Sequence, residues 1–363
     1  MDILEFMGSN GHEQVIMYSD PKAGLKAIIA IHDTTLGPGC GGVRMWPYET
    51  EELAVRDALR LSKAMTYKSA AAELPLGGGK GVIIGDARTQ KTEALLRAFG
   101  RFVESVGGRY LATTDVGTTG RDLEDIYQET SYVVGLPTTA GGSGDTSVMT
   151  GLGVYMGIKA CAKEVWGSDS LRGKRIAMQG FGKVAFNTAH HLVKEDAQLV
   201  VTDIYEDALD RARDMGLQVV QPEEIYDTEC DIFSPCALGG VINKDTIPRL
   251  RARVVAGAAN NQLLTDNDGE ELHRRGILYA PDYLVNAGGI INISAEIGMT
   301  YNPDRAREKT ERIYEIMGRI IQTSKEEEIS TARAADVYAE KRLASVRAVK
   351  QIYRPNRRGS SLA

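Results

Sequence analysis

Apolar and polar residues in the second half of the chain follow a pattern typical of parallel strands joined by helices. Short apolar runs are separated by helical or turn segments, and these runs cover residues 176–178, 199–202, 231–234, 254–256 and 277–279. A strand buried on both faces forms a short continuous apolar run, and a parallel connection needs a crossover helix. The pattern therefore predicts a parallel sheet with crossover helices, which is an α/β fold.

The first half of the chain has a different pattern. It begins with a strand-like run over residues 25–31 and passes through glycine-rich turns, and the segment LPTTAGGSGDTSVMT at 136–150 has the composition of a loop or hinge. A helix is expected from Thr150 to about Trp166. A length of 363 residues suits two domains. We expect one domain over residues 1–140 and another over 141–330, with residues 331–363 returning to the first.

Helical patterns dominate the C-terminal part. Asn302 and Pro303 make a good helix start, because Asn caps the backbone and Pro suits the first helical position. Four apolar residues then repeat at helical spacing, and we interpret them as core packing: Ile313, Ile316, Met317 and Ile320. A last helix over residues 332 to about 351 needs a surface, in the first domain or at a subunit interface, for Val337, Leu343 and Val346.

Charge and composition exclude several classes of partner. The net charge of -6 comes from mixed acidic and basic residues, so nucleic acid is not expected as a partner. The basic tail of Arg354, Arg357 and Arg358 is interpreted as a solvated end. No apolar run approaches the roughly 20 residues that span a bilayer, and the N-terminus lacks a signal-peptide pattern. We therefore expect no membrane contact and a cytoplasmic location.

The cysteines and histidines point to neither disulfides nor a metal. The four cysteines are too few and too scattered for a disulfide framework: Cys40, Cys161, Cys230 and Cys236. Neither they nor the five histidines show the spacing of metal ligands. We expect reduced thiols and no bound metal.

A dinucleotide-binding motif follows the strand-like run RIAMQ. In this motif Gly180 permits a tight turn, Gly182 lets the backbone approach a pyrophosphate, and Ala185 allows close helix packing; the intervening residues are Phe181, Lys183 and Val184. A second strand, LVVTD, ends about twenty residues later in Asp203, whose carboxylate suits the ribose hydroxyls and repels a 2′-phosphate. The combination predicts a Rossmann-type domain that binds NAD rather than NADP, although Asp203 alone would also suit a strand end or a helix cap.

Three residues of the first half are candidates for chemistry. Lys68 lies in a helix-like stretch, Lys80 ends the glycine-rich segment of residues 76–79, which we interpret as a loop, and Asp115 lies between a strand end and a turn. Two lysines near one pocket would repel, and burial would disfavour the charged form, so one lysine is expected to have a lowered pKa. Asp115 is the candidate general base. The alternative is that all three are ordinary solvated side chains.

Seven motifs, in order along almost the whole chain, give a specific resemblance. The runs IIAIHDTTLGP, GGVRMWPY, MTYKSAAAELPLGGGK, TTDVGTT, DIFSPCALGG, AGAANNQL and YAPDYLVNAGGIIN resemble the glutamate/leucine/phenylalanine/valine dehydrogenase family, closest to its leucine dehydrogenases. The resemblance implies NAD-dependent oxidative deamination of an apolar L-amino acid to its 2-oxo acid and ammonia. It further implies a homo-oligomer, an octamer or a dimer, in which a cleft between an N-terminal α/β substrate domain and the NAD domain closes.

The resemblance also implies roles for individual residues. Lys68 would bind the substrate carboxylate with the backbone of Gly41 and Gly42, Lys80 would polarise the carbonyl or water, and Asp115 would move protons. Asn261 would contact the substrate or the nicotinamide region. Further family positions on the coenzyme side are Thr150, Pro235, Cys236, Ala237 and Asn286.

Substrate specificity would come from apolar walls, which the resemblance assigns to Cys40, Met65, Thr113, Val134, Ile290 and Ile293. Ile290 and Ile293 would share a helix face, although both suit plain core packing. Cys40 and Thr113 depart from the usual residues of leucine dehydrogenases. Leucine, valine and isoleucine are the expected substrates, because one methylene discriminates by only about 1 to 3 kcal/mol. Phenylalanine or tryptophan is the alternative, and glutamate is disfavoured because no extra cation is evident.

Two alternatives of other classes stay open. One is a catalytically silent NAD-binding regulator, against which the three candidate residues argue. The other is an NAD-linked enzyme of one-carbon or hydroxy-acid metabolism, which would not need the paired lysines.

Overall fold

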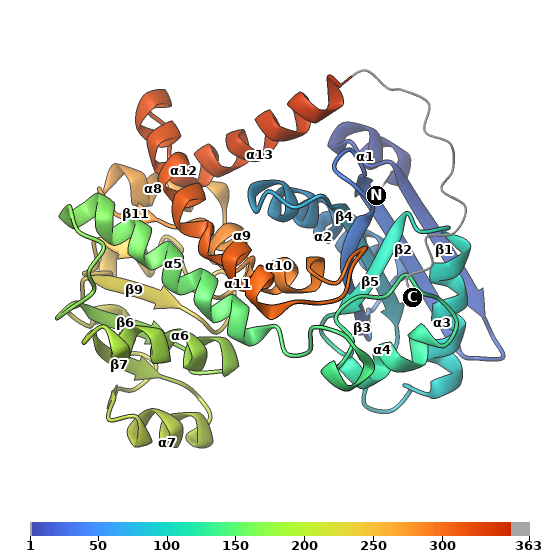
Figure 1. The fold of residues 1–363 in the computed structure, drawn as a ribbon, viewed down its shortest axis with the longest axis horizontal. Helices are drawn as coiled ribbons and strands as arrows, with labels where there is room; N and C mark the ends of the chain where they lie inside the picture. Colours follow the sequence, from blue (N-terminus) through green and yellow to red (C-terminus); the bar gives the residue numbers. More distant parts are fainter. Residues whose placement is uncertain (1, 350–363) are drawn as a thin grey trace. The chain divides into compact units, whose positions relative to one another are not determined.

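The computed structural model describes residues 2–349, which form two compact units (Figure 1). The first unit comprises Met1–Asp145, Ile293–Pro303 and Ala339–Ala363, and the second comprises Thr146–Asn292 and Asp304–Tyr338. The chain thus passes between the units near residue 145, five residues after the expected boundary. It differs from the expected division in two further places, because residues 293–303 belong to the first unit and residues 331–338 to the second.

The first unit is built on a mixed five-stranded sheet. Its strands are β1 (Gln14–Asp20), β2 (Leu25–Asp33), β3 (Gly39–Trp46), β4 (Gly77–Ile84) and β5 (Tyr110–Thr114), in the order β1-β2-β4-β3-β5. β1 and β4 run antiparallel to β2, whereas β3 runs parallel to β4 and β5. The helices are α1 (Ile3–Asn10), α2 (Glu51–Ala71), α3 (Glu93–Ser105), α4 (Gly120–Tyr127) and the 3-10 turn Thr138–Ala140.

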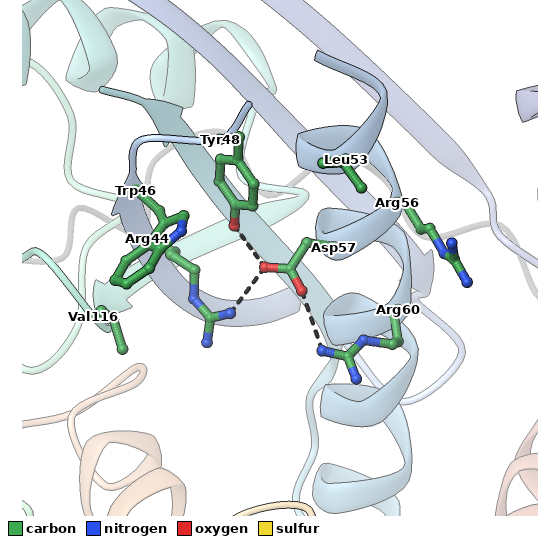
Figure 2. A pocket seen from close by; sticks show the side chains of 8 residues that line it. All are labelled: Arg44, Trp46, Tyr48, Leu53, Arg56, Asp57, Arg60 and Val116. Carbon is green, nitrogen blue, oxygen red and sulfur yellow. Dashed lines mark hydrogen bonds and ion pairs between the residues drawn. The ribbon is translucent and has the colours of Figure 1, made fainter. Parts of the chain in front are cut away.

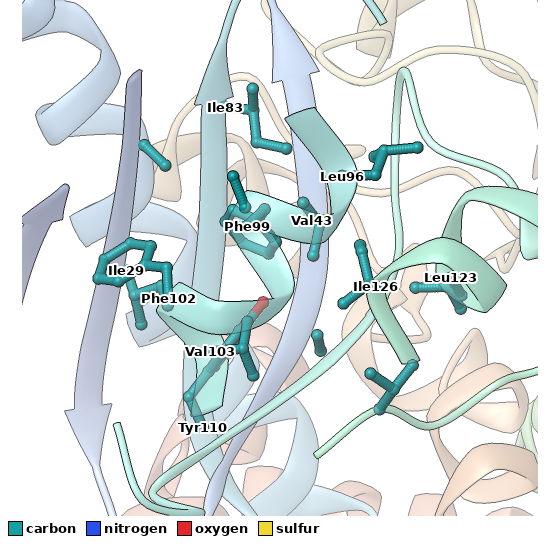
Figure 3. Close-up of a cluster of buried hydrophobic side chains, with 14 of the residues drawn as sticks. Ile29, Val43, Ile83, Leu96, Phe99, Phe102, Val103, Tyr110, Leu123 and Ile126 are labelled. Atoms are coloured by element: carbon teal, nitrogen blue, oxygen red, sulfur yellow. The ribbon is translucent and has the colours of Figure 1, made fainter. Parts of the chain in front are cut away.

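Alternation along the strands sends side chains to two separate cores. Ile29, Val43 and Ile83 pack with α3 and α4 around Phe99 and Phe102 (Figure 3). The residues of opposite parity, Ile28, Ala30 and Val82, pack with α2. Successive residues of a strand point to opposite faces, so Lys80 and Arg44, which share the parity of Val82, lie on the α2 face.

The glycine run before Lys80 is a strand, not the predicted loop. Residues 77–79 begin β4 and are buried between β2 and β3. A Cβ on Gly78 would overlap Thr66 and Ser62 of α2, and a Cβ on Gly79 would lie 2.7 Å from the Tyr110 ring. The prediction was wrong because glycines were taken for turn residues, whereas here they let helix and neighbouring strands approach the backbone closely.

The second unit contains a six-stranded sheet in which every pair is parallel, as predicted. The order is β11-β10-β9-β6-β7-β8. The strands are β6 (Arg175–Gln179), β7 (Gln198–Thr202), β8 (Gln218–Val219), β9 (Ile232–Pro235), β10 (Val254–Val255) and β11 (Leu278–Tyr279). The sequence pattern missed β8, because this two-residue edge strand carries no apolar run.

The strands are connected by α6 (Lys183–Lys194), α7 (Glu206–Asp214) and α8 (Asp266–Arg274), with 3-10 turns at Ile225–Asp227 and Ile247–Arg249. The helix α5 (Ser147–Trp166) precedes the first strand, and α9 (Asp282–Val285) follows the last. A parallel sheet with crossover helices is the Rossmann-type arrangement. The predicted α/β fold class is thereby confirmed.

Four helices complete the described chain: α10 (Gly288–Ser294), α11 (Pro303–Glu311), α12 (Ile313–Glu327) and α13 (Thr331–Arg347). The predicted stripe of α12 is buried, so its interpretation as core packing is confirmed. Leu343 of α13 packs with Ala70 of α2. The end of the predicted last helix and the three tail arginines lie outside the described residues. None of the helices within residues 2–349 has the length and apolarity to span a membrane.

Candidate active site

A buried ion pair joins two of the three residues predicted for chemistry. Lys80 Nζ of β4 donates a hydrogen bond to Oδ2 of Asp115, which directly follows β5. The Lys80 side chain is only 6% exposed and that of Asp115 22%. The turn after Asp115 is fixed by Thr118, whose hydroxyl accepts from the Asp115 N–H and donates to the carbonyl of Val43 at 2.7 Å. The turn, fixed in this way to β3, thus holds the carboxylate against the ammonium.

The surroundings shift both pKa values downward. Burial lowers the pKa of Lys80, and the charge of Arg44 lowers it further, so that Asp115 restores only part of the shift. Burial alone would raise the pKa of Asp115, but Lys80 and Arg44 outweigh it. The predicted lowering of a lysine pKa agrees with this direction, and Arg44, which was not predicted, is one cation that contributes to it.

Arg44 and two partners extend this pair and were missed in the sequence. Arg44 Nε donates to Asp115 Oδ2 at 2.9 Å, and its Nη1 donates to Oδ2 of Asp57 on α2 at 2.8 Å. The Tyr48 hydroxyl donates to the same Asp57 oxygen at 2.6 Å (Figure 2). They were missed because an arginine on a strand and an aspartate on a helix are both common at solvent-facing positions. The only indication in the sequence was the alternation of side chains along β3, which puts Arg44 on the same face of the sheet as Lys80.

Gly41 and Gly42 lie where the backbone must come close to this pair. A Cβ on Gly42 would lie 2.6 Å from Cβ of Asp115, and one on Gly41 would overlap the backbone of Gly79. Because Gly41 and Gly42 have no side chains, the backbone of β3 can lie directly beside Lys80 and Asp115.

Lys68 and Met65 lie in the last turns of α2 and are half-buried. Thr66, between them, packs onto Gly78, two residues before Lys80. The C-terminal part of α2 therefore lies over β4, on the face that carries Lys80.

Two of the predicted wall residues meet at Gly135, and a third, Val134, precedes it in the chain. A Cβ on Gly135 would lie 2.8 Å from Oγ1 of Thr113 and 3.3 Å from Cγ2 of Ile293. Glu296, missed in the sequence, accepts hydrogen bonds from the Gly135 N–H at 3.0 Å and the Ser143 N–H at 2.6 Å. Cys40 is also buried, and Ile290, on α10 with Ile293, is buried but belongs to the second unit.

The glycine-rich turn of the second unit fits a dinucleotide. Gly180 has a φ of +94°, and a Cβ there would lie 2.7 Å from Cβ of Ala237, so only glycine suits this turn. A Cβ on Gly182 would meet nothing within 4 Å, and Gly182 caps α6 without a side-chain hydrogen bond. The turn therefore leaves free space at a helix N-terminus, which is favourable for an anion.

Asp203 braces this turn. Its Oδ2 accepts a hydrogen bond from the Phe181 N–H at 2.6 Å, and its Oδ1 accepts one from the Tyr205 N–H at 3.0 Å. The carboxylate is half-buried, so a face stays available to solvent. Lys183 is exposed and Val184 half-buried at the start of α6, while the small Ala185 is fully packed.

Most of the remaining coenzyme-side residues follow neighbouring strands. Cys236 and Ala237 follow β9, and Asn261 follows β10 with a φ of +52°. Their loops pair through Gly240 N–H and the Asn261 carbonyl at 2.7 Å, and Asn286 Nδ2 donates to the Ala258 carbonyl at 3.1 Å. Because the carboxyl ends of parallel strands meet at one edge, these loops lie on the edge that carries Gly180. Thr150 instead lies in the first turn of α5, where its hydroxyl donates to the Thr146 carbonyl.

A cavity of about 620 Å³ opens on the first unit beside Arg44 (Figure 2). Lys80 and Asp115 do not line it; the lining residues are Arg44, Trp46, Tyr48, Leu53, Arg56, Asp57, Arg60 and Val116. In the part of the chain that the structure describes, no three His, Cys, Asp or Glu side chains gather to hold a metal ion.

Comparisons with known proteins decide the family. The family described as "Glu/Leu/Phe/Val dehydrogenase, dimerisation domain" matches residues 12–132, and "Glutamate/Leucine/Phenylalanine/Valine dehydrogenase" matches residues 141–205 and 201–356. The chain belongs to this family. A leucine dehydrogenase of Bacillus cereus is 51% identical over 357 residues, which cover 98% of this chain and 97% of that one.

Relatives that act on aromatic amino acids are nearly as similar. A phenylalanine dehydrogenase of Caldalkalibacillus thermarum is 47% identical, with 98% of each chain covered. The crystal structure of an L-tryptophan dehydrogenase from Nostoc punctiforme superposes with a TM-score of 0.84 at 45% identity, covering 95% of this chain and 99% of that one.

These matches confirm the family resemblance, the enzyme class and the two-part fold with a Rossmann-type sheet. The chain is an amino acid dehydrogenase, of a family whose coenzyme is NAD or NADP. The alternative of a one-carbon or hydroxy-acid enzyme is thereby removed.

Proposed function

We propose that this protein catalyses the reversible oxidative deamination of leucine, valine or isoleucine, with NAD as coenzyme, to the 2-oxo acid and ammonia. The observation that carries the proposal is the buried Lys80–Asp115 pair beside the glycine backbone of β3. A lysine whose pKa is lowered by burial exchanges protons closer to the working pH than a solvated one. An adjacent carboxylate is the natural partner for that proton.

The proposed roles are those that the family resemblance implies. Lys68 binds the substrate carboxylate with help from the backbone of Gly41 and Gly42. Lys80 polarises the water that attacks the imine, and Asp115 carries the proton as ammonia leaves. NAD, when bound, accepts the hydride from the α-carbon.

We propose that the coenzyme is held by the turn around Gly182, with Asp203 on the ribose hydroxyls. Support comes from the free space at Gly182 and from a carboxylate fixed at the end of β7. A negative charge there disfavours a 2′-phosphate, which is the reason to prefer NAD to NADP. Cys236, Ala237, Asn261, Asn286 and Thr150 are proposed for the nicotinamide side.

The substrate is proposed from the apolar walls of the first unit. Thr113 and Ile293 lie together at Gly135, Val134 is the preceding residue, and none of the three offers a cation for an acidic side chain. An aromatic substrate is the second candidate, because relatives specific for phenylalanine and tryptophan share 47% and 45% identity with this chain. Relative kcat/KM values for leucine, valine, phenylalanine, tryptophan and glutamate separate the two.

We further propose a cytoplasmic homo-oligomer, an octamer or a dimer. All four cysteines are free, which suits a reducing compartment. The N-terminal match is to a dimerisation domain. Sedimentation of the purified protein measures the oligomeric state.

Lys80→Ala tests the proposed chemistry. NADH formation with leucine is expected to fall at least about 1000-fold, the scale on which acid-base groups contribute, while NADH binding, measured by fluorescence, stays within about twofold. The matched control is Lys26→Ala, which removes a lysine from an exposed ion pair with Glu51 and is expected to leave both measurements unchanged. Turnover by Lys80→Ala at the wild-type rate would refute the role. A wild-type protein that binds NADH but turns over no amino acid would instead be the silent regulator.

A further inference from the structure

Arg44 lies at the centre of a chain of charged groups that ends on the reacting pair. One edge of its guanidinium donates to Asp115 Oδ2 and the other to Asp57 Oδ2, at 2.9 and 2.8 Å. Asp115 Oδ2 is also the atom that accepts from Lys80. A single carboxylate oxygen is thus shared between the ammonium and the guanidinium.

Asp57 holds Arg44 in turn. Its Oδ2 accepts from Arg44 and from the Tyr48 hydroxyl, and its Oδ1 accepts from Arg60 at 3.3 Å (Figure 2). The side chain of Asp57 is 16% exposed and that of Arg44 23%. A planar guanidinium that bridges two carboxylates has little freedom to rotate, so its position fixes the position of Asp115.

We propose that Arg44 is a positioning residue of the reaction: it holds the Asp115 carboxylate against Lys80 and sets the charge balance of that pair, while Asp57 and Tyr48 hold Arg44. The proposal rests on the proposed function of Lys80 and Asp115. It assigns Arg44, Asp57 and Tyr48 a part in the chemistry without contact with the substrate.

The charges around Lys80 make this role measurable. From β3 Arg44 disfavours the ammonium, whereas Asp115 after β5 and Asp57 on α2 favour it. Tyr110 of β5 is buried with a pKa raised well above its ordinary value, so it stays neutral. On β2, Ala30 lies opposite Lys80 in the sheet, and the residues on either side of Ala30 are apolar. On α2, Lys68 is a further cation.

Two substitutions should therefore act in opposite directions. Arg44→Met removes a positive charge, so the pKa of Lys80 should rise. Asp57→Asn keeps an oxygen acceptor for Arg44 but removes a negative charge, so the pKa of Lys80 should fall. A substitution that merely loosened the fold would not produce opposite shifts.

The test is the pH profile of kcat for both variants. The limb on which activity rises with pH should move to higher pH in Arg44→Met and to lower pH in Asp57→Asn. The comparison is made at the pH where wild-type kcat is half of its maximum, with each kcat expressed as a fraction of that variant's own maximum. At this pH we expect the fraction to fall about three- to tenfold in Arg44→Met and to rise in Asp57→Asn. Arg44→Lys keeps the positive charge but loses the planar guanidinium that bridges Asp115 and Asp57. The pH at which its kcat is half-maximal should therefore stay near that of the wild type, while its maximal kcat falls.

A second readout does not depend on turnover. The pH dependence of Lys80 modification by trinitrobenzenesulfonate, followed by peptide mass spectrometry, reports its protonation directly. Arg60→Met is the matched control, because Arg60 is 63% exposed and donates to Oδ1 of Asp57 rather than to the Oδ2 atom that holds Arg44; its profiles should match the wild type.

The outcomes separate the two proposals. Opposite shifts in both readouts support the role of Arg44. Opposite shifts in modification alone also support it, but show that Lys80 does not control the rate, so the proposed function of Lys80 fails. Unshifted profiles, or shifts in the same direction, overturn the role of Arg44. If Arg44→Met does not fold, Asp57→Asn and Arg44→Lys still decide the question.

Discussion

Gly182→Ala separates coenzyme binding from stability. The backbone of Gly182 has φ -71° and ψ -174°, which alanine adopts without strain, and an added Cβ meets no protein atom within 4 Å. Alanine is a poorer helix cap than glycine by about 0.5 kcal/mol, but it lowers the entropy of the unfolded chain by a similar amount. The free energy of unfolding should therefore stay within about 0.5 kcal/mol of the wild type.

Coenzyme binding should respond differently. If the pyrophosphate approaches this backbone, the methyl group occupies its place and costs at least one charge-assisted hydrogen bond. Such a bond contributes about 1.5 to 3 kcal/mol, so the Kd for NADH should rise about 10- to 150-fold.

The assay is a fluorescence titration with NADH and a thermal melt on the same preparation. The control is Gly173→Ala, which has the same open surroundings but a φ of +71°, so it should lose stability and keep its affinity for NADH. Unchanged NADH affinity in a folded Gly182→Ala protein would refute the assignment of this turn to the pyrophosphate.

Three further predictions concern stability and substrate binding. Gly78→Ala forces a Cβ into α2 and should cost about 2 kcal/mol in urea unfolding, whereas Gly318→Ala, in open space on α12, should gain up to about 1. Asp115→Asn leaves Lys80 buried without its carboxylate and should lower stability by about 3 kcal/mol at neutral pH. Because the folded pKa of Asp115 is lowered, this difference should hold above the unfolded pKa and shrink as the pH falls through the folded one; a pH-independent difference in Tm would contradict it. Arg342→Met removes hydrogen bonds to the carbonyls of Ser69 and Ala70 at the end of α2 and of Leu74 beyond it. Because the same end of α2 carries Lys68, the KM for the amino acid should rise about three- to tenfold, with the KM for NAD unchanged.

The sequence predicted the second unit well because its signals are local. A glycine turn, the strand before it and the aspartate after the next strand all lie within one βαβ segment of about 30 residues. The structure brings Phe181 and Asp203 into direct contact, which this local spacing anticipates. The division between units was harder to place, because residues 293–303 join the first unit through Glu296, more than 150 positions from its partners.

The candidate active site was predicted only in part. Lys80 lies on β4 and Asp115 directly follows β5, and both strands are neighbours of β3 but not of each other, so their contact depends on strand order, which no local pattern reveals. Arg44 and Asp57 were missed for the same reason, since each is an ordinary polar residue of its own element. The direction of the Lys80 pKa could be predicted, whereas the contribution of Arg44 to it could not.

The glycines of β4 connect the fold to the chemistry. Four of the five residues at 77–81 have no side chain, and around them α2, β3 and the Tyr110 ring approach the strand more closely than any Cβ would allow. Lys80 is the exception, and its side chain, on the face that α2 covers, is only 6% exposed. Burial is the largest cause of its lowered pKa, so substituting Gly78, which lets α2 approach this face of β4, should change the chemistry of Lys80 without changing the lysine itself.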